Sequence, residues 1–576
     1  MDNAALARYL SEIADLLEIR GDNPFKIRAY RNASEVVIAE TRRVAELDEA
    51  ALRELPGIGK DLAQRIREFA TTGDSPFRQE VAASFPPTLL ELLRLQGVGP
   101  KTVKRLYDEM GIASLDALED AAKSGRIRVM KGMGSRKEAL ILKAIDERRR
   151  YVGRHLAATV ATTAQAIIDR LSWLEPATEI VPVGSLRRGA ETCGDLDLLA
   201  AGGTPALMTA FVGQPDVIRV LGLGDTKASV LLTSGLQADL RLVETTSKGA
   251  ALQYFTGSKS HNIALRDRAL SRGMRLNEYG LFLLDGTRLA GDTEEDIYDA
   301  LGLEYVPPEL REFRGEIERA EARSLPRLIE RADLHGDLHM HTTTTDGKDG
   351  IEAMATAAKA AGLQYIAITD HSQALAMAGG LDEHRALTHA ATIREVGRRL
   401  DGITLLAGIE CDIRPDGAMD LADDCLAQLD VVIASVHSGF GQEPAALTER
   451  YLRAIDNPWV DVLGHPTGRL LLKREPLAFD LDAVIAAAVR QGVAIEINCQ
   501  VDRLDVGDGV ARHALEQGAR LVISSDAHSV KAFATLDLGV RVARRAWATA
   551  ADVLNTRPLA ELRQQLRRHR SASLAS

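Results

Sequence analysis

The hydrophobic pattern of the chain changes twice along its 576 residues, near Arg150 and again near Asp333. Before Arg150, apolar residues recur at helical spacing and the segments are separated by short glycine turns. From there to about residue 315, apolar runs of strand length alternate with helical segments. After Asp333, short β-rich runs such as YIAIT, VVIAS and VAIEIN alternate with alanine-rich helical segments. The pattern therefore predicts a multidomain α/β protein with a helical N-terminal part.

Three glycine turns in the helical part share one pattern, in which G-x-G follows an apolar helix end and precedes a basic helix. They lie in LPGIGKD, LQGVGPK and MKGMGSR. Backbone N–H groups at such a helix start can bind a phosphate oxygen without reading a base. One copy alone could be a simple helix cap, but three copies favour helix-hairpin-helix binding to DNA. The residues expected to contact DNA here are Gly57, Gly59, Lys60, Gly97, Gly99 and Lys101.

Three aspartates interrupt apolar runs that otherwise predict buried strands. Asp195 and Asp197 lie two residues apart in DLDLLAA, and Asp239 lies in LQADLRLVE. Residues i and i+2 of a strand point to the same face, so the first two carboxylates repel each other unless cations lie between them. Two-metal phosphoryl transfer uses such ligands around ions about 3.5–4 Å apart. For a D-x-D sequence alone, a salt-bridged strand pair is the alternative.

Nine histidine, aspartate and glutamate residues lie at or just after the predicted strands of the C-terminal part. The carboxyl ends of strands in a barrel meet at one end, so these side chains are expected to converge there. A mixture of imidazole and carboxylate ligands suits Zn²⁺ or Mn²⁺. A lone histidine at such a position is more often structural, but the whole set predicts a metal centre. It consists of His339, His341, Asp346, His371, Glu410, His437, His465, Asp526 and His528.

Two longer stretches, GSLRRGAETCGDLDLL and YFTGSKSHNIALRDRAL, closely resemble signatures of family X DNA polymerases. The resemblance runs through residues 1–315 and implies a nucleotidyltransferase-type α+β palm followed by a thumb. It implies Asp195, Asp197 and Asp239 as the catalytic ligands of Mg²⁺ or Mn²⁺. It also implies nucleotide contacts from Ser185, Arg188, Gly189, Tyr254, Phe255, Gly257 and Asn262.

The same resemblance implies several contacts outside the nucleotide site. Arg266 is similar to a residue that contacts the template strand, and Lys26 and Tyr30 match positions that bind the 5′-phosphate of a DNA gap. Arg241 and Glu278 resemble a pair that rearranges when the active site closes.

One position departs from the pattern of the lyase members of this family. Arg65 stands where those members carry the lysine that forms a Schiff base. A guanidinium stays protonated and cannot form that imine. We therefore expect no strong 5′-deoxyribose phosphate lyase activity through this residue, with Lys60, one turn away, as a possible substitute.

The C-terminal part, over roughly residues 334–570, resembles the PHP (polymerase and histidinol phosphatase) family. This implies a distorted (β/α)₇ barrel with three metal ions, Mn²⁺ or Zn²⁺, that hydrolyses phosphoesters. Asp346 stands where some relatives have histidine, which favours Mn²⁺. Asp370 is expected to support its neighbour His371. Arg469 is expected either to hold a substrate phosphate or to form a surface salt bridge.

The expected domain boundaries follow from the patterns and the two resemblances. They are a 5′-phosphate-binding helix-hairpin-helix domain at 1–80, helical fingers with a further helix-hairpin-helix at 81–153, the palm at 154–245, the thumb at 246–315, a charged helical linker at 316–333 and the PHP barrel at 334–576.

Hydropathy, cysteine content and net charge limit the classes of protein to which the chain can belong. No apolar run approaches about 18 residues and the N-terminus lacks a signal pattern, so a soluble cytoplasmic protein without membrane contact is expected. The four scattered cysteines contain no C-x-x-C pair, which favours free buried thiols over disulfides or a zinc knuckle. The net charge is −11 and arises mostly after Asp333, so DNA binding by the N-terminal part must use local patches and backbone groups.

The leading hypothesis is a monomeric DNA repair polymerase that fills short gaps in primer–template DNA carrying a 5′-phosphate, using deoxynucleoside triphosphates. Its PHP domain would be a metal-dependent 3′→5′ exonuclease, with 3′-phosphatase or abasic-site endonuclease activity as extensions of the same site. Two alternatives stay open at this point. The PHP domain could be a small-molecule phosphatase, or the chain could be a DNA-end binding scaffold with idle active sites.

Overall fold

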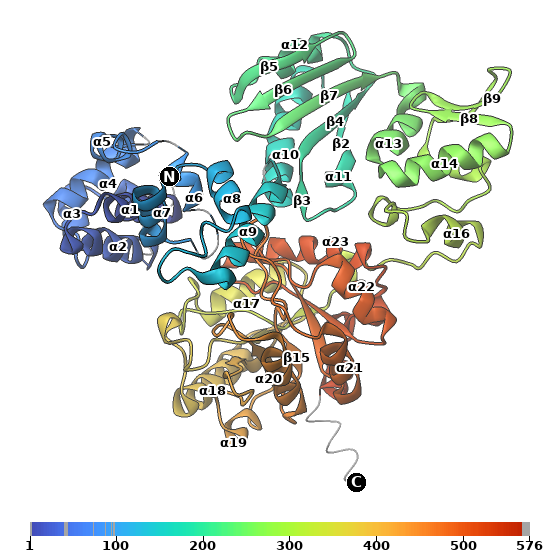
Figure 1. Cartoon of the computed structure of the whole chain (residues 1–576). Helices are drawn as coiled ribbons and strands as arrows, with labels where there is room; N and C mark the ends of the chain where they lie inside the picture. The colour runs from blue at the N-terminus through green and yellow to red at the C-terminus, as the bar shows by residue number, and fades with distance from the viewer. Residues whose placement is uncertain are drawn as a thin grey trace. The chain divides into compact units, whose positions relative to one another are not determined.

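The computed structural model describes residues 3–39, 44–72, 74–86, 88–93, 95, 98–151 and 153–566 (Figure 1). The chain divides into two compact units, Met1–Val152 and Gly153–Ser576. No helix in the described part of the chain combines the length and the hydropathy needed to cross a membrane. All four cysteines are buried and free, as expected.

The first unit is helical throughout its described part and holds two hydrophobic cores. One core forms around Leu10, Leu17 and Ile66, and the other around Leu106 and Leu118. Ser75 and Ser114 cap two of the helices by accepting a backbone N–H three residues ahead, which is why those helices begin where they do. The helices are α1 (Asn3–Arg20), α2 (Pro24–Ala39), α3 (Glu49–Glu54), α4 (Lys60–Thr72), α5 (Pro76–Ala82), α6 (Leu89–Leu92), α7 (Pro100–Met110), α8 (Leu115–Lys123) and α9 (Gly134–Tyr151), with a 3₁₀ turn η1 at Val44–Glu46.

The palm segment (154–245) contains a mixed sheet in the order β2-β4-β7-β6-β5. The strands are β2 (Glu179–Pro182), β4 (Asp195–Ala201), β5 (Val217–Leu223), β6 (Lys227–Leu232) and β7 (Gln237–Val243). Helices α10 (Ala157–Leu174) and α12 (Ala206–Val212) pack their apolar residues against one face of this sheet (Figure 1). A short antiparallel pair, β1 (His155–Leu156) and β3 (Thr192–Cys193), precedes β4, and the single turn α11 (Gly184–Arg187) follows β2.

The thumb segment (246–315) begins with two helices and continues as an antiparallel sheet in the order β10-β9-β8. Gly249 lies where the first of these helices meets the backbone of Thr293, since a Cβ there would lie 2.2 Å from the Thr293 carbonyl carbon. Only glycine permits so close an approach. The elements are η2 (Thr245–Ser247), α13 (Lys248–Thr256), α14 (Lys259–Ser271), β8 (Met274–Asn277), β9 (Gly280–Leu283), β10 (Arg288–Ala290), α15 (Glu294–Ala300) and η3 (Pro308–Leu310).

A buried anion, Glu294 of α15, joins the palm segment to the thumb segment. Its carboxylate accepts hydrogen bonds from Arg187 at 2.6 and 2.9 Å and from the fully buried Arg311 at 2.6 Å. Burial acts to raise the pKa of Glu294, but Arg311 and Arg187 outweigh it and lower the pKa to about 2. The pairing therefore fixes the turn α11, which carries Ser185, against the thumb segment.

Replacing Glu294 by glutamine is expected to lower the free energy of unfolding by about 3 kcal/mol at pH 7, because the buried Arg311 then lacks its counter-charge. The folded pKa is depressed, so the stabilisation is present above the ordinary value of 4.5 and is lost as pH falls toward about 2. Urea denaturation of the wild type and of Glu294→Gln at pH 7 and at pH 3 measures the difference in the free energy of unfolding and how it changes with pH. The exposed neighbour Glu295→Gln is the control, and an equal stability difference at both pH values would contradict the linkage.

The segment from residue 316 to 333 has one α-helix, α16 (Glu316–Glu321), and otherwise only a single 3₁₀ turn at Arg331–Asp333, so the expectation of a helical linker was wrong for most of its second half. Pro326 disfavours a helix there, because it lacks an N–H and restricts the residue before it. Glu316 is fully buried, and its Oε1 lies 2.7 Å from His261 Nδ1 of the thumb segment. Glu316 therefore does not face solvent, and its contact with His261 holds this end of the segment against the thumb segment.

The C-terminal segment is a seven-stranded parallel sheet in the order β11-β12-β13-β14-β15-β16-β17. An isolated parallel bridge from Met340 to Ala527 brings its first and last strands together, so the sheet forms a nearly closed barrel. The strands are buried on both faces, as parallel strands covered by helices must be. They are β11 (Gly336–Asp337), β12 (Tyr365–Ile368), β13 (Thr404–Asp412), β14 (Val431–Ser435), β15 (Val462–Leu463), β16 (Ala494–Asn498) and β17 (Leu521–Ser524).

Helices surround this barrel, as the yellow to red part of Figure 1 shows. Inside, Tyr365, Leu406 and Ile433 form a core that Leu562 of the last helix closes. The helices are α17 (Ile351–Ala360), α18 (Glu383–Arg399), α19 (Asp423–Leu426), α20 (Pro444–Asp456), α21 (Leu481–Gln491), α22 (Asp508–Glu516), α23 (Leu536–Arg545) and α24 (Leu559–Gln565), with short 3₁₀ turns η4 (Arg331–Asp333), η5 (Ala376–Ala378), η6 (Val530–Thr535), η7 (Ala550–Asp552) and η8 (Leu554–Thr556).

Candidate active sites in the palm and the barrel

The three aspartates predicted to act together lie on two neighbouring parallel strands. In the register of β4 with β7, Asp197 stands directly opposite Asp239, and Asp195 lies two residues before Asp197. Asp195 is exposed, Asp197 is half-buried and Asp239 is buried. Lys227 of β6 pairs with Asp239 at 3.0 Å. The sheet thus brings the carboxylates to one place from segments more than forty residues apart.

The electrostatics of this cluster favour bound cations. Burial, together with the charges of Asp195 and Asp239, raises the pKa of Asp197 to about 6. Burial also acts to raise the pKa of Asp239, but hydrogen bonds from Lys227 and Gln237 outweigh it and lower that pKa. Divalent cations with oxygen ligands would relieve the repulsion that raises the pKa of Asp197. The donor set therefore fits metal ions of the Mg²⁺ or Mn²⁺ type.

A cleft of about 620 Å³ opens beside the aspartates. Two of its lining residues, Arg154 and Lys259, were missed by sequence reasoning, although Lys259 follows Gly257 by only two positions. Gly189 does not line the cleft and instead packs toward the C-terminal barrel. The predicted residues that do line it are Ser185, Arg188, Asp195, Asp197, Tyr254, Phe255, Gly257, Asn262 and Arg266.

The glycine turn after β2 approaches the aspartates closely. Gly184 has φ of 64°, and a Cβ there would lie 2.8 Å from the Asp197 carboxylate. Arg188 donates from Nη1 to the carbonyl of Thr256 at 2.6 Å and from Nε to Glu312 at 3.0 Å. The guanidinium is thus held at the wall of the cleft, between the palm and thumb segments. Its charge and the turn suit an anionic phosphate ligand.

The aromatic pair at the end of α13 is ordered by its neighbours. Tyr254 and Phe255 pack edge to face at 5.1 Å, and the Arg241 guanidinium lies 4.4 Å from the Phe255 ring centre. Asn262 donates to the Tyr254 carbonyl at 2.6 Å. Arg241 and Glu278 both line a second cleft of about 1000 Å³, and their predicted rearrangement stays a prediction.

In the first unit, Lys26 and Tyr30, which were predicted to bind a 5′-phosphate, gather with Arg65 around Phe77. Lys26 Nζ lies 4.2 Å from the Phe77 ring centre, the Arg65 guanidinium carbon 5.0 Å, and the Tyr30 ring centre 6.0 Å. Tyr30 is buried, and its hydroxyl has no hydrogen-bond partner among the described residues. Arg65 also forms ion pairs with Glu68 at 3.1 Å and with Asp61 at 3.6 Å.

The glycine turns lie directly before helix starts. Gly57 and Gly59 precede α4, where Lys60 is exposed, and Gly99 is the N-cap of α7, where Lys101 is exposed. No side chain caps α7. Pro100 has no N–H and the Thr102 N–H donates to the Gly99 carbonyl at 2.8 Å, so the Lys101 N–H is the group at this helix start that could bind an external oxygen. Gly97 lies outside the described residues.

The nine predicted ligands converge at one end of the barrel. Six strands and the loops after them supply the ligands. His339, His341 and Asp346 follow β11, His371 follows β12, and Glu410 lies in β13, while β14, β15 and β17 are followed by His437, by His465, and by Asp526 and His528. Three close groups result: His341, Asp346, His371 and His528; His339, His341 and Asp526; and His371, Glu410 and His437. His465 joins them through a 2.9 Å contact with Glu410.

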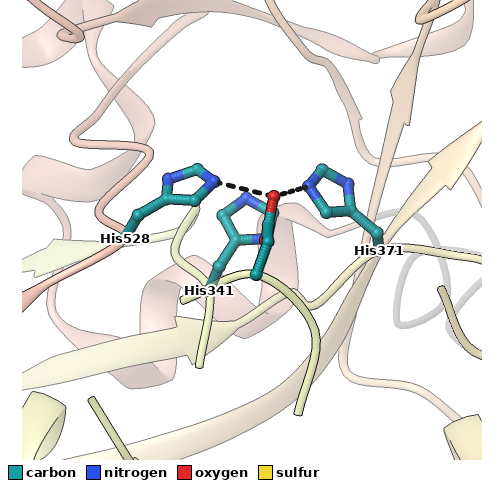
Figure 2. Close-up of side chains that lie close together, drawn as sticks. His341, His371 and His528 are labelled. Atoms are coloured by element: carbon teal, nitrogen blue, oxygen red, sulfur yellow. Dashed lines mark ion pairs between the residues drawn. The ribbon is translucent and has the colours of Figure 1, made fainter. Parts of the chain in front are cut away.

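Asp346 and Glu410 are the centres of this cluster. Asp346 lies 3.3 Å from His371 Nε2, 3.4 Å from His528 Nε2 and 3.8 Å from His341 Nδ1. Figure 2 shows these three imidazoles pointing toward one another from separate segments. Glu410 is 1% exposed and lies 2.8 Å from His371 Nδ1. His465 and Asp526, with φ of 30° and 50°, have left-handed backbone conformations that are uncommon outside glycine.

The cluster fits metal ions. His339 Nε2, His341 Nδ1 and His465 Nδ1 are buried without a hydrogen-bond partner among the described residues, although each can be a metal ligand. Burial acts to lower the pKa of His371, but Glu410 and Asp346 outweigh it and raise that pKa to about 10. A field that holds an extra proton this firmly also attracts a divalent cation. The imidazole and carboxylate donors suit Mn²⁺ or Zn²⁺.

A second set of buried carboxylates orients the ligands, and sequence reasoning missed most of it. Glu496 of β16 lies 2.7 Å from His339 Nδ1 and accepts the His465 backbone N–H at 2.7 Å. Asp370, which was expected to support its neighbour His371, instead accepts from Thr342, the residue after His341, and lies 2.8 Å from His389 Nε2. Glu496 in VAIEIN gave the same signal as Asp197 in DLDLLAA, a charge inside an apolar strand. β16, the strand of this barrel that carries none of the nine ligands, therefore contributes to the site indirectly through Glu496.

Models of known families match four parts of the chain. They are a helix-hairpin-helix domain at 1–75, a SAM-like helix-hairpin-helix tandem at 89–147, the DNA polymerase beta thumb at 251–312 and the PHP domain at 337–500. These folds and sites define a class of chains that join a polymerase beta-like core to a PHP barrel.

The relatives cover different shares of the chain. A DNA polymerase/3′-5′ exonuclease PolX of Bacillus subtilis (strain 168) is 36% identical over 573 residues, which is 99% of this chain and 100% of the relative. Probable phosphatases of Shewanella sp. (strain ANA-3) and Thermoanaerobacter sp. (strain X514) are 32% and 30% identical, over 39% and 38% of this chain and 89% of their own length. The chain therefore belongs to the family X DNA polymerases that carry a PHP domain.

Proposed function

We propose that this chain is a DNA repair polymerase that fills short gaps and shortens 3′ ends with its PHP barrel. One observation carries the proposal: a single chain holds two separate clusters of candidate metal ligands, three carboxylates in the palm and nine side chains in the barrel. The relative that covers its full length is named for both activities. We propose that it acts as a monomer on gapped DNA and uses deoxynucleoside triphosphates.

In the palm, the proposed roles follow from position. Asp195 and Asp197 would hold the metal ions and Asp239 would lie near the primer end, with Lys227 limiting its negative charge. Ser185 and Arg188 would bind the triphosphate, with Gly189 shaping the turn that carries Arg188, and Tyr254, Phe255, Gly257 and Asn262 would contact the sugar and base. When bound, Mg²⁺ or Mn²⁺ would supply activation of the primer hydroxyl and neutralisation of phosphate charge. Arg266 would contact the template strand.

In the barrel, the ligands differ in exposure, and this indicates how DNA enters. Asp346 and His528 have exposed fractions of 35% and 30%, whereas His339 and Glu410 are buried. The scissile phosphate would therefore approach from the side of Asp346 and His528. When bound, three ions of the Mn²⁺ or Zn²⁺ type would supply water activation and charge neutralisation. Glu496 and Asp370 would keep the ligands in place between turnovers.

The experiment uses a 5′-labelled primer on gapped DNA that carries a 5′-phosphate. The full chain is incubated with Mn²⁺, with and without deoxynucleoside triphosphates, and product length is read on a gel. Growth with nucleotides and shortening without them are expected, and a chelator should stop both. If neither growth nor shortening occurs, the proposal fails and a non-catalytic role at DNA ends gains support.

A small-molecule phosphatase is the less favoured reading of the barrel. The probable phosphatases match only the barrel part, whereas the PolX relative matches the whole chain. A competition experiment distinguishes a phosphatase from an exonuclease. If the barrel is an exonuclease, an excess of a phosphomonoester should leave primer shortening unchanged. Strong inhibition at millimolar phosphomonoester would favour the phosphatase.

The 5′-phosphate site lacks the lysine of a lyase, and this gives a further prediction. Borohydride trapping of the full chain on DNA with a 5′-deoxyribose phosphate is expected to be weak, because the Arg65 guanidinium cannot form an imine. Arg65→Lys, which places an amine beside Tyr30, is expected to increase trapping at least about tenfold. Lys60→Ala tests the other candidate amine. Efficient trapping by the wild type that is lost in Arg65→Ala would contradict the prediction.

A further inference from the structure

Glu312, just after the thumb helices, lies between two guanidinium groups that come from different parts of the second unit. Its Oε1 accepts from Arg188 Nε at 3.0 Å and from Arg545 Nη1 at 2.9 Å. Arg188 lines the nucleotide cleft, whereas Arg545 is the last residue of α23 in the barrel. All three side chains are largely buried, with exposed fractions of 16%, 19% and 8% for Arg188, Glu312 and Arg545. One carboxylate oxygen therefore links the nucleotide cleft to the barrel.

Arg545 also holds the backbone of the nucleotide turn. Its Nη1 donates to the main-chain carbonyl of Arg188 at 2.9 Å. Its Nη2 pairs with Asp508 of α22 at 3.1 Å, which fixes the guanidinium from the barrel side. A Cβ added at Gly189 would lie 3.6 Å from Arg545 Cδ, so the turn passes close to this helix.

The far end of the same turn is attached to the barrel as well. Arg469 pairs with Glu191 at 2.6 Å and donates to the carbonyls of Arg503 and Leu504. Arg469 was expected either to hold a substrate phosphate or to form a surface salt bridge, and the contact with Glu191 favours the salt bridge. Both ends of the segment from Arg188 to Glu191 are thus fixed by arginines that do not belong to the polymerase core.

We propose that Arg545 is a positioning residue for nucleotide addition, which controls how readily Glu312 releases Arg188 to the triphosphate. The inference rests on the proposed function, in which Arg188 binds the triphosphate. While no nucleotide is bound, Glu312 holds the Arg188 guanidinium, so an incoming triphosphate must compete with Glu312 for it. Arg545 weakens the hold of Glu312 on Arg188 because it shares the same oxygen.

The direction of the effect follows from charge. If Arg545 is removed, Glu312 keeps only Arg188 as a cationic partner and binds it more strongly. When Arg188 moves to the triphosphate, the carboxylate is then left buried without a counter-charge. Both consequences disfavour nucleotide binding. If the charge of Glu312 is also removed, the competition disappears and the loss of Arg545 should matter little.

The test compares Arg545→Met, Glu312→Gln and the double variant in primer extension by the full chain. Arg545→Met is expected to raise KM for the nucleotide about tenfold, with kcat changed less than about twofold. Glu312→Gln is expected to have a KM at or below that of the wild type. The double variant should have the KM of Glu312→Gln, so that the two substitutions are strongly non-additive.

Arg544→Met is the matched control, because Arg544 is the neighbouring interface arginine and pairs with Glu309 at 2.7 Å instead of Glu312. Its KM should equal that of the wild type. Primer shortening without nucleotides should be unchanged in Arg545→Met, which shows that the barrel is folded. Loss of both activities that Glu312→Gln does not relieve would overturn the proposal.

Arg188→Ala separates this inference from the proposed function. A raised KM in Arg188→Ala with a wild-type KM in Arg545→Met would overturn the role of Arg545 alone. A wild-type KM in Arg188→Ala would instead show that Arg188 does not bind the triphosphate, and both statements would fail.

Discussion

Asp197→Asn is expected to reduce primer extension by about 1,000-fold or more while primer shortening continues at the rate of the wild type. Asp197 stands opposite Asp239 in the register of β4 with β7 and lies beside Gly184. An amide in this place is a weaker ligand for a hard divalent cation and removes one of the charges that draw it in. Single-turnover extension on gapped DNA, with and without added Mn²⁺, measures the effect.

Asp225→Asn is the control for this substitution, because Asp225 is an exposed carboxylate of the same palm segment. It should extend primers like the wild type. Asp195→Ala should behave like Asp197→Asn, since both carboxylates belong to one site. Wild-type extension by either active-site variant would remove the basis for the polymerase assignment.

Glu410→Gln is expected to abolish primer shortening, by about 1,000-fold or more, and to leave primer extension intact. Glu410 contacts His371, His437 and His465 at 2.8, 3.3 and 2.9 Å, so it joins the groups of ligands into one centre. Loss of its charge removes the field that attracts the cations. Metal content after dialysis, measured by elemental analysis, should fall together with the activity.

His339→Ala and His437→Ala should give the same pattern as Glu410→Gln. His384→Ala is the control, because His384 is an exposed histidine on α18. If the two ligand variants keep full primer shortening, the barrel is not the exonuclease. If Glu410→Gln loses shortening but keeps its full metal content, Glu410 acts on the substrate rather than on the metal.

Sequence reasoning found the candidate ligands because buried charge is conspicuous in an apolar strand. Asp197 and His339 stand out for this reason, and the structure brings each into a cluster of the expected composition. Glu496 gave the same signal but was not recognised, since its partner His339 lies 157 residues away. Lys227, which pairs with Asp239, carries no local signal, because an exposed-looking lysine near a strand start is ordinary.

The partners of several charged residues could not be predicted from the sequence, because they depend on which side chains lie nearby in space. Arg469 stands close to His465, and only the contact with Glu191 distinguishes an ion pair from a phosphate site. The burial of Glu316 at the start of α16 depends on its contact with His261, 55 residues earlier in the chain. Glu312 pairs with two arginines that lie far from it in the sequence. Arg188 is 124 positions away and Arg545 is 233 positions away.

The sequence by itself determined the helical N-terminal part, the alternation that produces the barrel, and nearly all residues of the two candidate metal sites. These features are local: hydrophobic period, glycine turns, and charges placed in apolar strands. Only the tertiary structure decided which charges neutralise one another, because Coulomb interactions depend on distance in space and on burial. The contacts of Arg469 and Arg545 with the segment from Arg188 to Glu191 belong to this second kind.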